Sequence, residues 1–127
     1  VASWPRPTTD NAVNTDRVRA MSIGKVYPLY VAKVERKGAS VADLDTAICW
    51  LTGYSPAKLA KLVADETSLE DFFAGATMHD NAGLITGVIC GVRVEQIEDP
   101  FMKCVRQLDK IVDEVANGRP LTKVLRA

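Results

Sequence analysis

The chain has 127 residues, of which 16 are Lys or Arg and 16 are Asp or Glu, and 47% are hydrophobic. This length is enough for one domain with its own hydrophobic core. The zero net charge supplies no long-range field toward nucleic acid or an anionic membrane. No apolar stretch reaches the ~18 to 20 residues of a membrane span, so we expect no membrane-spanning segment.

The three cysteines, Cys49, Cys90 and Cys104, lie far apart in apolar segments and form no Cys-x-x-Cys pair. This spacing disfavours a disulfide framework or a zinc site. It predicts that all three are small buried hydrophobic residues in a reducing compartment.

The first segment, 1–19, is expected to be a polar N-terminal extension, and 20–127 a single helical domain. The chain begins at Val1. Removal of a targeting segment would make an organelle matrix, such as the mitochondrial matrix, an alternative to the cytoplasm. Trp4 has no local core to join, so we expect it to dock into a groove on this chain or on another.

A helix is predicted from Ser22 to Lys37, because apolar residues recur there at helical spacing and Gly38 follows as a stop. Pro28 lacks the N–H that would bond to the carbonyl of Gly24. The helix therefore either kinks at Pro28 or starts there.

Three shorter helices are predicted next, each with its own cap. Ser40 precedes the first, which Gly53 ends, and Ser55 precedes the second, with a proline at its first position. Thr67 and Glu70 have the spacing of a capping box before the third.

The segment 84–97 fits two structures. Its β-branched residues suit a buried strand, but five apolar residues from Leu84 to Val92 also fit one helical face, and we favour the helix. Gly83, Gly87 and Gly91 would then form a bare stripe. We interpret this stripe as a site of close internal packing or, alternatively, as a groove where a ligand or partner backbone approaches.

The last long helix is predicted to start with Asp99 as its cap and to end at Asn117 and Gly118, with a short helical turn in 120–126. On its charged face we expect exposed ion pairs. These are Arg106 with Asp109, and Lys110 with Asp113 and Glu114. The fold class is therefore all-α, a compact bundle of about five or six short helices, with an irregular or extended piece near 92–98 left open.

Several stretches of the sequence resemble a known bacterial family. They are 26–31, 35–38, Trp50-Leu51-Thr52-Gly53-Tyr54, the run from Leu84 to Pro100, 108–110 and 123–126. The family is known as domain of unknown function 2200, and the resemblance covers roughly 20 to 126. No chemistry is assigned to this family, so the resemblance implies no activity.

Gly53, Ser55, Leu59 and Leu62 have the spacing of a helix-turn-helix. The face that would contact DNA offers Lys58 and Lys61 but no Arg, Asn or Gln for base edges. DNA binding through 46–64 is therefore only a second alternative, and nucleic acid is disfavoured as a partner.

Recognisable catalytic and metal-binding motifs are missing from the sequence. His79 is the only histidine and has no nucleophile motif. Glu95, Glu98 and Asp99 form an acidic cluster, but a helix cap and the helix dipole explain two of them. We predict no catalytic residue, no metal and no cofactor.

We expect a non-catalytic protein-interaction module, an accessory subunit of a larger complex, whose partners are other protein chains or copies of itself. The candidate interaction residues are Trp4, Gly87, Gly91 and Arg93, with Trp50 and Tyr54 as further aromatics suited to an interface. The alternative is a small-molecule-binding or enzymatic domain with a pocket near Gly87 to Arg93, where Arg93 would hold an anionic group.

Overall fold

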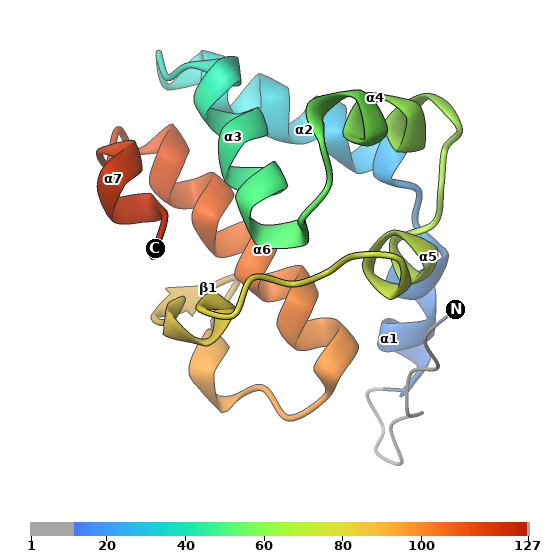
Figure 1. Ribbon diagram of the computed structural model, residues 1–127. Helices are drawn as coiled ribbons and strands as arrows, with labels where there is room; N and C mark the ends of the chain where they lie inside the picture. Colours follow the sequence, from blue (N-terminus) through green and yellow to red (C-terminus); the bar gives the residue numbers. More distant parts are fainter. Residues whose placement is uncertain (1–11, 127) are drawn as a thin grey trace.

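Helices dominate the computed structural model, which describes residues 12–126 (Figure 1). The elements in chain order are α1 (Ala12–Ala20), α2 (Ile23–Arg36), α3 (Val41–Thr52), α4 (Pro56–Ala64), α5 (Leu69–Ala74), the 3₁₀ helix η1 (Ala82–Leu84), β1 (Val88–Ile89), β2 (Val92–Arg93), the 3₁₀ helix η2 (Val94–Gln96), α6 (Pro100–Ala116) and α7 (Leu121–Val124). The predicted compact helical fold is confirmed, and the irregular piece near 92–98 contains η2 and the loop before α6.

Side-chain caps set the helix starts, as the sequence predicts for α3, α4 and α6 and as Ser22 also does for α2. Ser22, Ser40, Ser55 and Asp99 each accept a hydrogen bond from a backbone N–H two or three residues later. The prediction for α5 is wrong by one residue, because Ser68, not Thr67, accepts the bond from the N–H of Asp71. Thr67 is held elsewhere, since its carbonyl accepts the N–H of Ile23 at 2.8 Å.

Helix α2 runs through Pro28 without ending, so the proline lies inside the helix and not in its first turn. Pro28 is exposed, so its ring does not disturb the core. Gly24 itself is needed for packing: a Cβ at this position would lie 2.6 Å from the carbonyl oxygen of Val63 in α4. The close approach of α2 and α4 therefore depends on this glycine.

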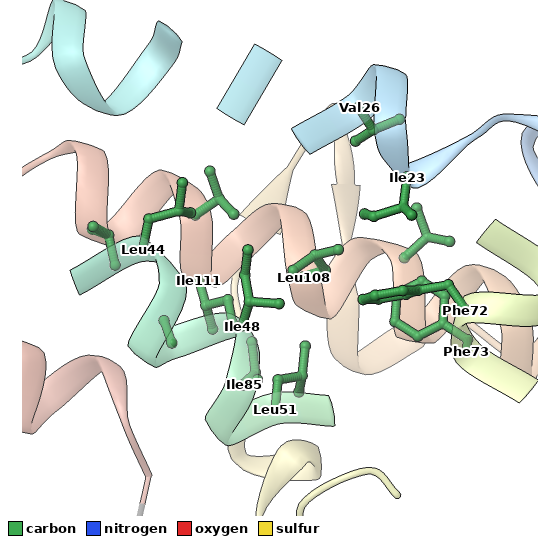
Figure 2. Close-up of a cluster of buried hydrophobic side chains, with 14 of the residues drawn as sticks. Ile23, Val26, Leu44, Ile48, Leu51, Phe72, Phe73, Ile85, Leu108 and Ile111 are labelled. Atoms are coloured by element: carbon green, nitrogen blue, oxygen red, sulfur yellow. The ribbon is translucent and has the colours of Figure 1, made fainter. Parts of the chain in front are cut away.

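The core surrounds α6, which packs against α2, α3, α5 and α7 (Figure 1). Figure 2 shows Ile48 and Leu51 of α3 beside Leu108 and Ile111 of α6, with Phe72 of α5 closing one end. The exposed fraction of these five side chains is at most 1%. Full burial of each of these side chains contributes about 1.5 to 3 kcal/mol of hydrophobic stabilisation.

Helix α1 occupies part of the segment expected to be an extension, and it packs against α5. Trp4 lies outside the described residues. The domain boundary near residue 20 stays a prediction. Within 12–126, no helix combines the length and the apolar character that crossing a bilayer requires.

Candidate protein-docking surface

The segment 84–97 forms a β-hairpin between two 3₁₀ helices, and the helix that we favoured there is wrong. Val88 pairs with Arg93 and Ile89 with Val92 in antiparallel register. The turn between them is Cys90-Gly91, and both residues have positive φ, 52° and 79°. Two successive positive φ values are the requirement of a type I′ turn, and such a turn is incompatible with a helix. Gly91, which we had placed in a helical stripe of glycines, instead forms part of the hairpin turn.

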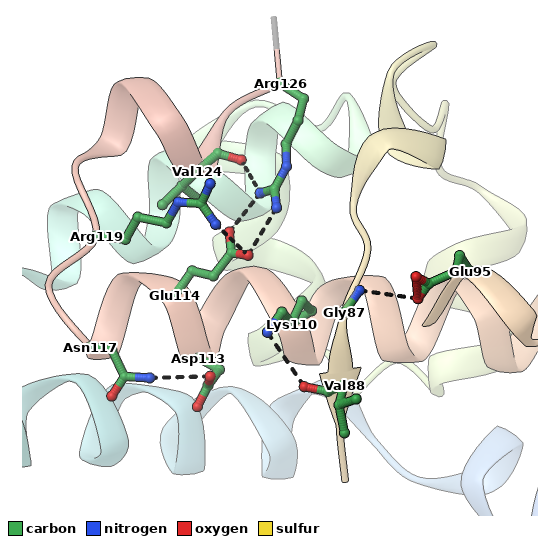
Figure 3. A network of polar contacts seen from close by, with 10 residues as sticks. All are labelled: Gly87, Val88, Glu95, Lys110, Asp113, Glu114, Asn117, Arg119, Val124 and Arg126. Atoms are coloured by element: carbon green, nitrogen blue, oxygen red, sulfur yellow. Dashed lines mark hydrogen bonds and ion pairs between the residues drawn. The ribbon is translucent and has the colours of Figure 1, made fainter. Parts of the chain in front are cut away.

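The base of the hairpin is anchored, while its outer part is exposed. Val94 is fully buried, and its N–H donates to the carbonyl of Gly87 at 2.9 Å. Lys110 Nζ of α6 donates to the carbonyl of Val88 at 3.4 Å, and the N–H of Gly87 donates to Glu95 Oε1 at 3.1 Å (Figure 3). These contacts fix the position of β1 over α6.

We call the exposed outer part the hairpin surface. It consists of Gly83, Leu84, Val88, Cys90, Gly91, Val92 and Arg93, all of them exposed. The exposed fractions of Leu84, Val88 and Val92 are 59%, 52% and 42%. Among the described residues only Met21 and Leu29 are comparably exposed large apolar side chains. Three of five such side chains therefore belong to one nine-residue stretch, which makes this stretch a candidate contact surface.

The glycines of this stretch do not support close internal packing, so that interpretation is wrong. A Cβ at Gly83 or Gly91 would meet no described atom within 4 Å. At Gly87 it would meet only the flexible end of Lys110, 3.1 Å away. Open space above Gly83 and Gly91 instead leaves their backbone accessible from outside the domain.

The cysteines behave differently from one another. Cys49 and Cys104 are half-buried, and burial raises the pKa of the Cys104 thiol to about 11. Cys90 is exposed, so the prediction of three buried cysteines is wrong for this residue. Its place in the hairpin turn is the reason, because a turn between two short strands has no core beside it.

His79 has structural contacts. Its ring stacks on Trp50 with 4.3 Å between the ring centroids, and its Nδ1 accepts the N–H of Asn81 at 3.0 Å. The Tyr54 hydroxyl donates to the carbonyl of Phe72. Trp50 and Tyr54, which we had considered for an interface, therefore both make contacts within the fold. The three ring systems instead hold the ends of α3 and α5 in place.

The acidic cluster is divided among different contacts. Asp99 caps α6. Hydrogen bonds from the backbone N–H groups of Glu95 itself and of Gly87, together with the nearby Arg93, lower the pKa of Glu95. Within residues 12–126, no group of three or more His, Cys, Asp or Glu side chains is placed to hold a metal ion. The prediction of no metal or cofactor stays a prediction.

Two of the ion pairs expected on α6 are wrong. Lys110 contacts the hairpin, and Asp113 pairs with Lys33 of α2 at 3.0 Å. Glu114 is buried and accepts two hydrogen bonds from Arg126, at 2.6 and 2.9 Å, and one from Arg119 at 3.0 Å (Figure 3). Sequence spacing missed this cluster because both arginines lie beyond the end of α6.

Helices α3 and α4 join through Gly53, which has a φ of 76°, as a helix-turn-helix requires. Lys58 and Lys61 are exposed on α4, and Lys61 pairs with Asp65 at 3.1 Å. A depression of roughly 370 Å³ lies elsewhere, between α1 and α5, lined by Asp16, Arg19, Ala20, Ser68 and Glu70. Its lining residues do not include Arg93 or any other residue of 87–93, the segment where we expected a pocket.

The fold and this surface define a small helical domain with a protruding hairpin. A family described as an uncharacterized protein conserved in bacteria (DUF2200) matches residues 17–126, and the chain belongs to this family. The structure of this chain is similar to the crystal structure of uncharacterized protein SP1917, with 35% sequence identity and a TM-score of 0.82. The match covers 94% of each chain. No curated protein matches the chain.

Proposed function

We propose that the chain is a non-catalytic protein-interaction module that binds a protein partner through the hairpin surface. The observation that carries this proposal is the exposure of Leu84, at the end of η1, and of Val88 and Val92 in the hairpin that follows. Covering them would remove apolar area from water, and each Å² is worth about 25 cal/mol before the costs of association.

Three side chains that could in principle take part in chemistry are already used in contacts within the fold, which agrees with a non-catalytic role. They are Glu114, His79 and Tyr54. Membership in a bacterial family favours the cytoplasm over an organelle matrix as the place where the module acts. An accessory role in a larger complex agrees with a partner-binding surface that is small and separate from the core.

Affinity capture with matched variants tests the proposal. Val88→Asp places a charge in the middle of the hairpin surface, whereas Met21→Asp places the same charge on an exposed apolar residue between α1 and α2. Tagged full-length chains are incubated with lysate of the source cells, and bound proteins are quantified by mass spectrometry. We expect partners that Met21→Asp retains and Val88→Asp loses. Equal capture by the two variants would contradict the proposal.

A separate titration addresses DNA. Lys58 and Lys61 are the groups that α4 would present to a duplex. Fluorescence anisotropy with mixed-sequence DNA at low salt is expected to show no binding, because the zero net charge of the chain supplies no excess of phosphate contacts. Binding that Lys58→Ala and Lys61→Ala abolish would favour the helix-turn-helix alternative over the hairpin surface.

A further inference from the structure

We infer that the depression between α1 and α5 is the docking site of the chain's own N-terminal segment 1–11; this inference is independent of the hairpin surface. The sequence predicts that Trp4 docks into a groove, and the depression, of roughly 370 Å³, is such a groove on this chain. It lies where α1 packs against α5 (Figure 1). The segment joins α1 at Ala12, so it begins close to this site.

The lining of the depression carries an excess of negative charge. Arg19 contributes one positive charge and donates to Glu70 at 2.8 Å, while Asp16 adds a second carboxylate. The side chain of Arg19 is 5% exposed, but that of Glu70 is 42% exposed, and Asp16 is exposed as well. In the segment 1–11, Arg6 is the only cationic side chain. A guanidinium is the group that best pairs with carboxylates, so Arg6 complements this lining.

The sequence of the segment favours docking at a low entropic cost. Trp4 precedes Pro5, and Arg6 precedes Pro7. A residue before proline avoids the helical region, so the sequence predicts an extended, polyproline-like preference for 4–7. Such a stiff segment loses less conformational freedom on binding than an ordinary linker does.

The spacing of the segment matches the spacing of the site. Asp16 and Ala20 both line the depression and lie one turn apart on α1, a rise of ~6 Å. Arg6 and Trp4 are two residues apart, which is also ~6 Å in a polyproline segment. When the segment doubles back along α1, Arg6 therefore lies over Asp16 and the Trp4 ring over Ala20. Ala20 has the smallest side chain of the lining, which leaves room for an indole ring.

The chain is long enough for this path. The six steps from Arg6 to Ala12 span at most ~22 Å when fully extended. The site is much closer, because Asp16 lies only ~6 Å along α1 from Ala12. The connection can therefore turn back without strain.

Fluorescence of Trp4 tests the inference in the full chain. Trp50→Phe makes Trp4 the only tryptophan, and phenylalanine keeps an aromatic ring beside His79. We expect acrylamide to quench Trp4 several-fold less in the chain than in a synthetic peptide of residues 1–11, because the docked ring is shielded from solvent. Equal quenching in the chain and in the peptide would overturn the inference.

Charge variants test the pairing of Arg6 with Asp16. Asp16→Lys places a like charge opposite Arg6 and should raise the quenching of Trp4 toward the value of the peptide. Asp80→Lys is the matched control, because Asp80 is exposed but does not line the depression, and it should leave the quenching unchanged. Adding Arg6→Glu to Asp16→Lys should restore the protection. Protection that Asp16→Lys leaves intact, or a loss without restoration, would overturn the inference. Circular dichroism establishes that each variant keeps the fold.

Nuclear Overhauser effects locate the ring in the unsubstituted chain. The indole protons of Trp4 should show contacts to the Ala20 methyl group, and their absence would overturn the inference. A dilution series distinguishes this chain from a second copy as the owner of the site, because docking within one chain does not depend on concentration. Protection of Trp4 that disappears on dilution would mean that the segment docks on another copy, which would also overturn the inference.

Discussion

Helix α3 and the hairpin segment are both rich in aliphatic residues, yet their side chains differ in burial. Leu44, Ile48 and Leu51 of α3 are completely buried, whereas Val88 and Val92 of the hairpin are about half exposed. The difference lies in the backbone. A helix brings residues three and four apart onto one face that can pack on α6, but a two-residue turn and short strands place alternate side chains on opposite faces. Apolar composition alone therefore does not decide burial.

The largest expected effect contrasts the core with the hairpin. Leu108→Ala in α6 removes a side chain that is 1% exposed and should lower the free energy of unfolding by about 2 to 5 kcal/mol. Val88→Ala in the hairpin should change it by no more than about 0.5 kcal/mol. Urea denaturation of both variants measures the contrast. Similar losses from both would mean that the hairpin is part of the cooperative core.

A smaller loss is expected where the end of the chain joins α6. Glu114→Ala leaves Arg126 without its carboxylate partner and should lower the free energy of unfolding by about 1.5 to 3 kcal/mol. Arg119→Ala is the control, because its side chain is 43% exposed and should contribute no more than about 1 kcal/mol. Equal effects in denaturation experiments would argue that the pairing of Glu114 with Arg126 adds no more stability than the exposed contact with Arg119.

The third prediction concerns pH. Burial raises the pKa of Tyr30, and its hydrogen bond to Asp109 raises it further. The folded state therefore keeps a proton that unfolded tyrosine releases at a pH of about 10. The stabilisation is fully present below that pH and is lost as the pH rises above it. Tyr30→Phe should lower stability at neutral pH by about 1.5 kcal/mol and reduce the alkaline loss.

Denaturation midpoints from pH 7 to above about 10 measure the effect. Burial and Asp45 also raise the pKa of Tyr27, and burial raises that of Cys104, so part of the alkaline loss should remain in Tyr30→Phe. An alkaline profile that the substitution leaves unchanged would contradict the role given to Tyr30. Tyr27→Phe is the matched comparison, because its hydroxyl also donates to a carboxylate.

The smallest expected effect lies in the hairpin turn. Gly91→Ala places a Cβ on a residue with a φ of 79° and should cost about 1 kcal/mol, although the space around it is open. Gly83→Ala, with equally open space and no positive φ, should be nearly neutral. Thermal denaturation compares the two. A cost at Gly83 that matches the cost at Gly91 would mean that φ does not control the turn.

The helices and their starts were predictable because their determinants are local. Ser22, Ser40, Ser55 and Asp99 act on backbone groups within three residues, and the apolar spacing of α3 and α6 directly identifies their buried faces. The candidate site was predictable only in part. Gly91 and Arg93 lie on the hairpin surface as exposed residues, but the helix expected there, its packed glycine stripe and the buried Cys90 were wrong.

By itself, the sequence determined the helical class of the fold, most of its caps and the membership of a bacterial family. Tertiary structure decided which apolar residues stay in water and which partners the charges find. Glu114 is paired with Arg126 and Lys110 with the Val88 carbonyl because segments distant in sequence meet across α6. Local patterns carry no information about such contacts, because the free energy of a long-range pair depends on how the whole chain packs.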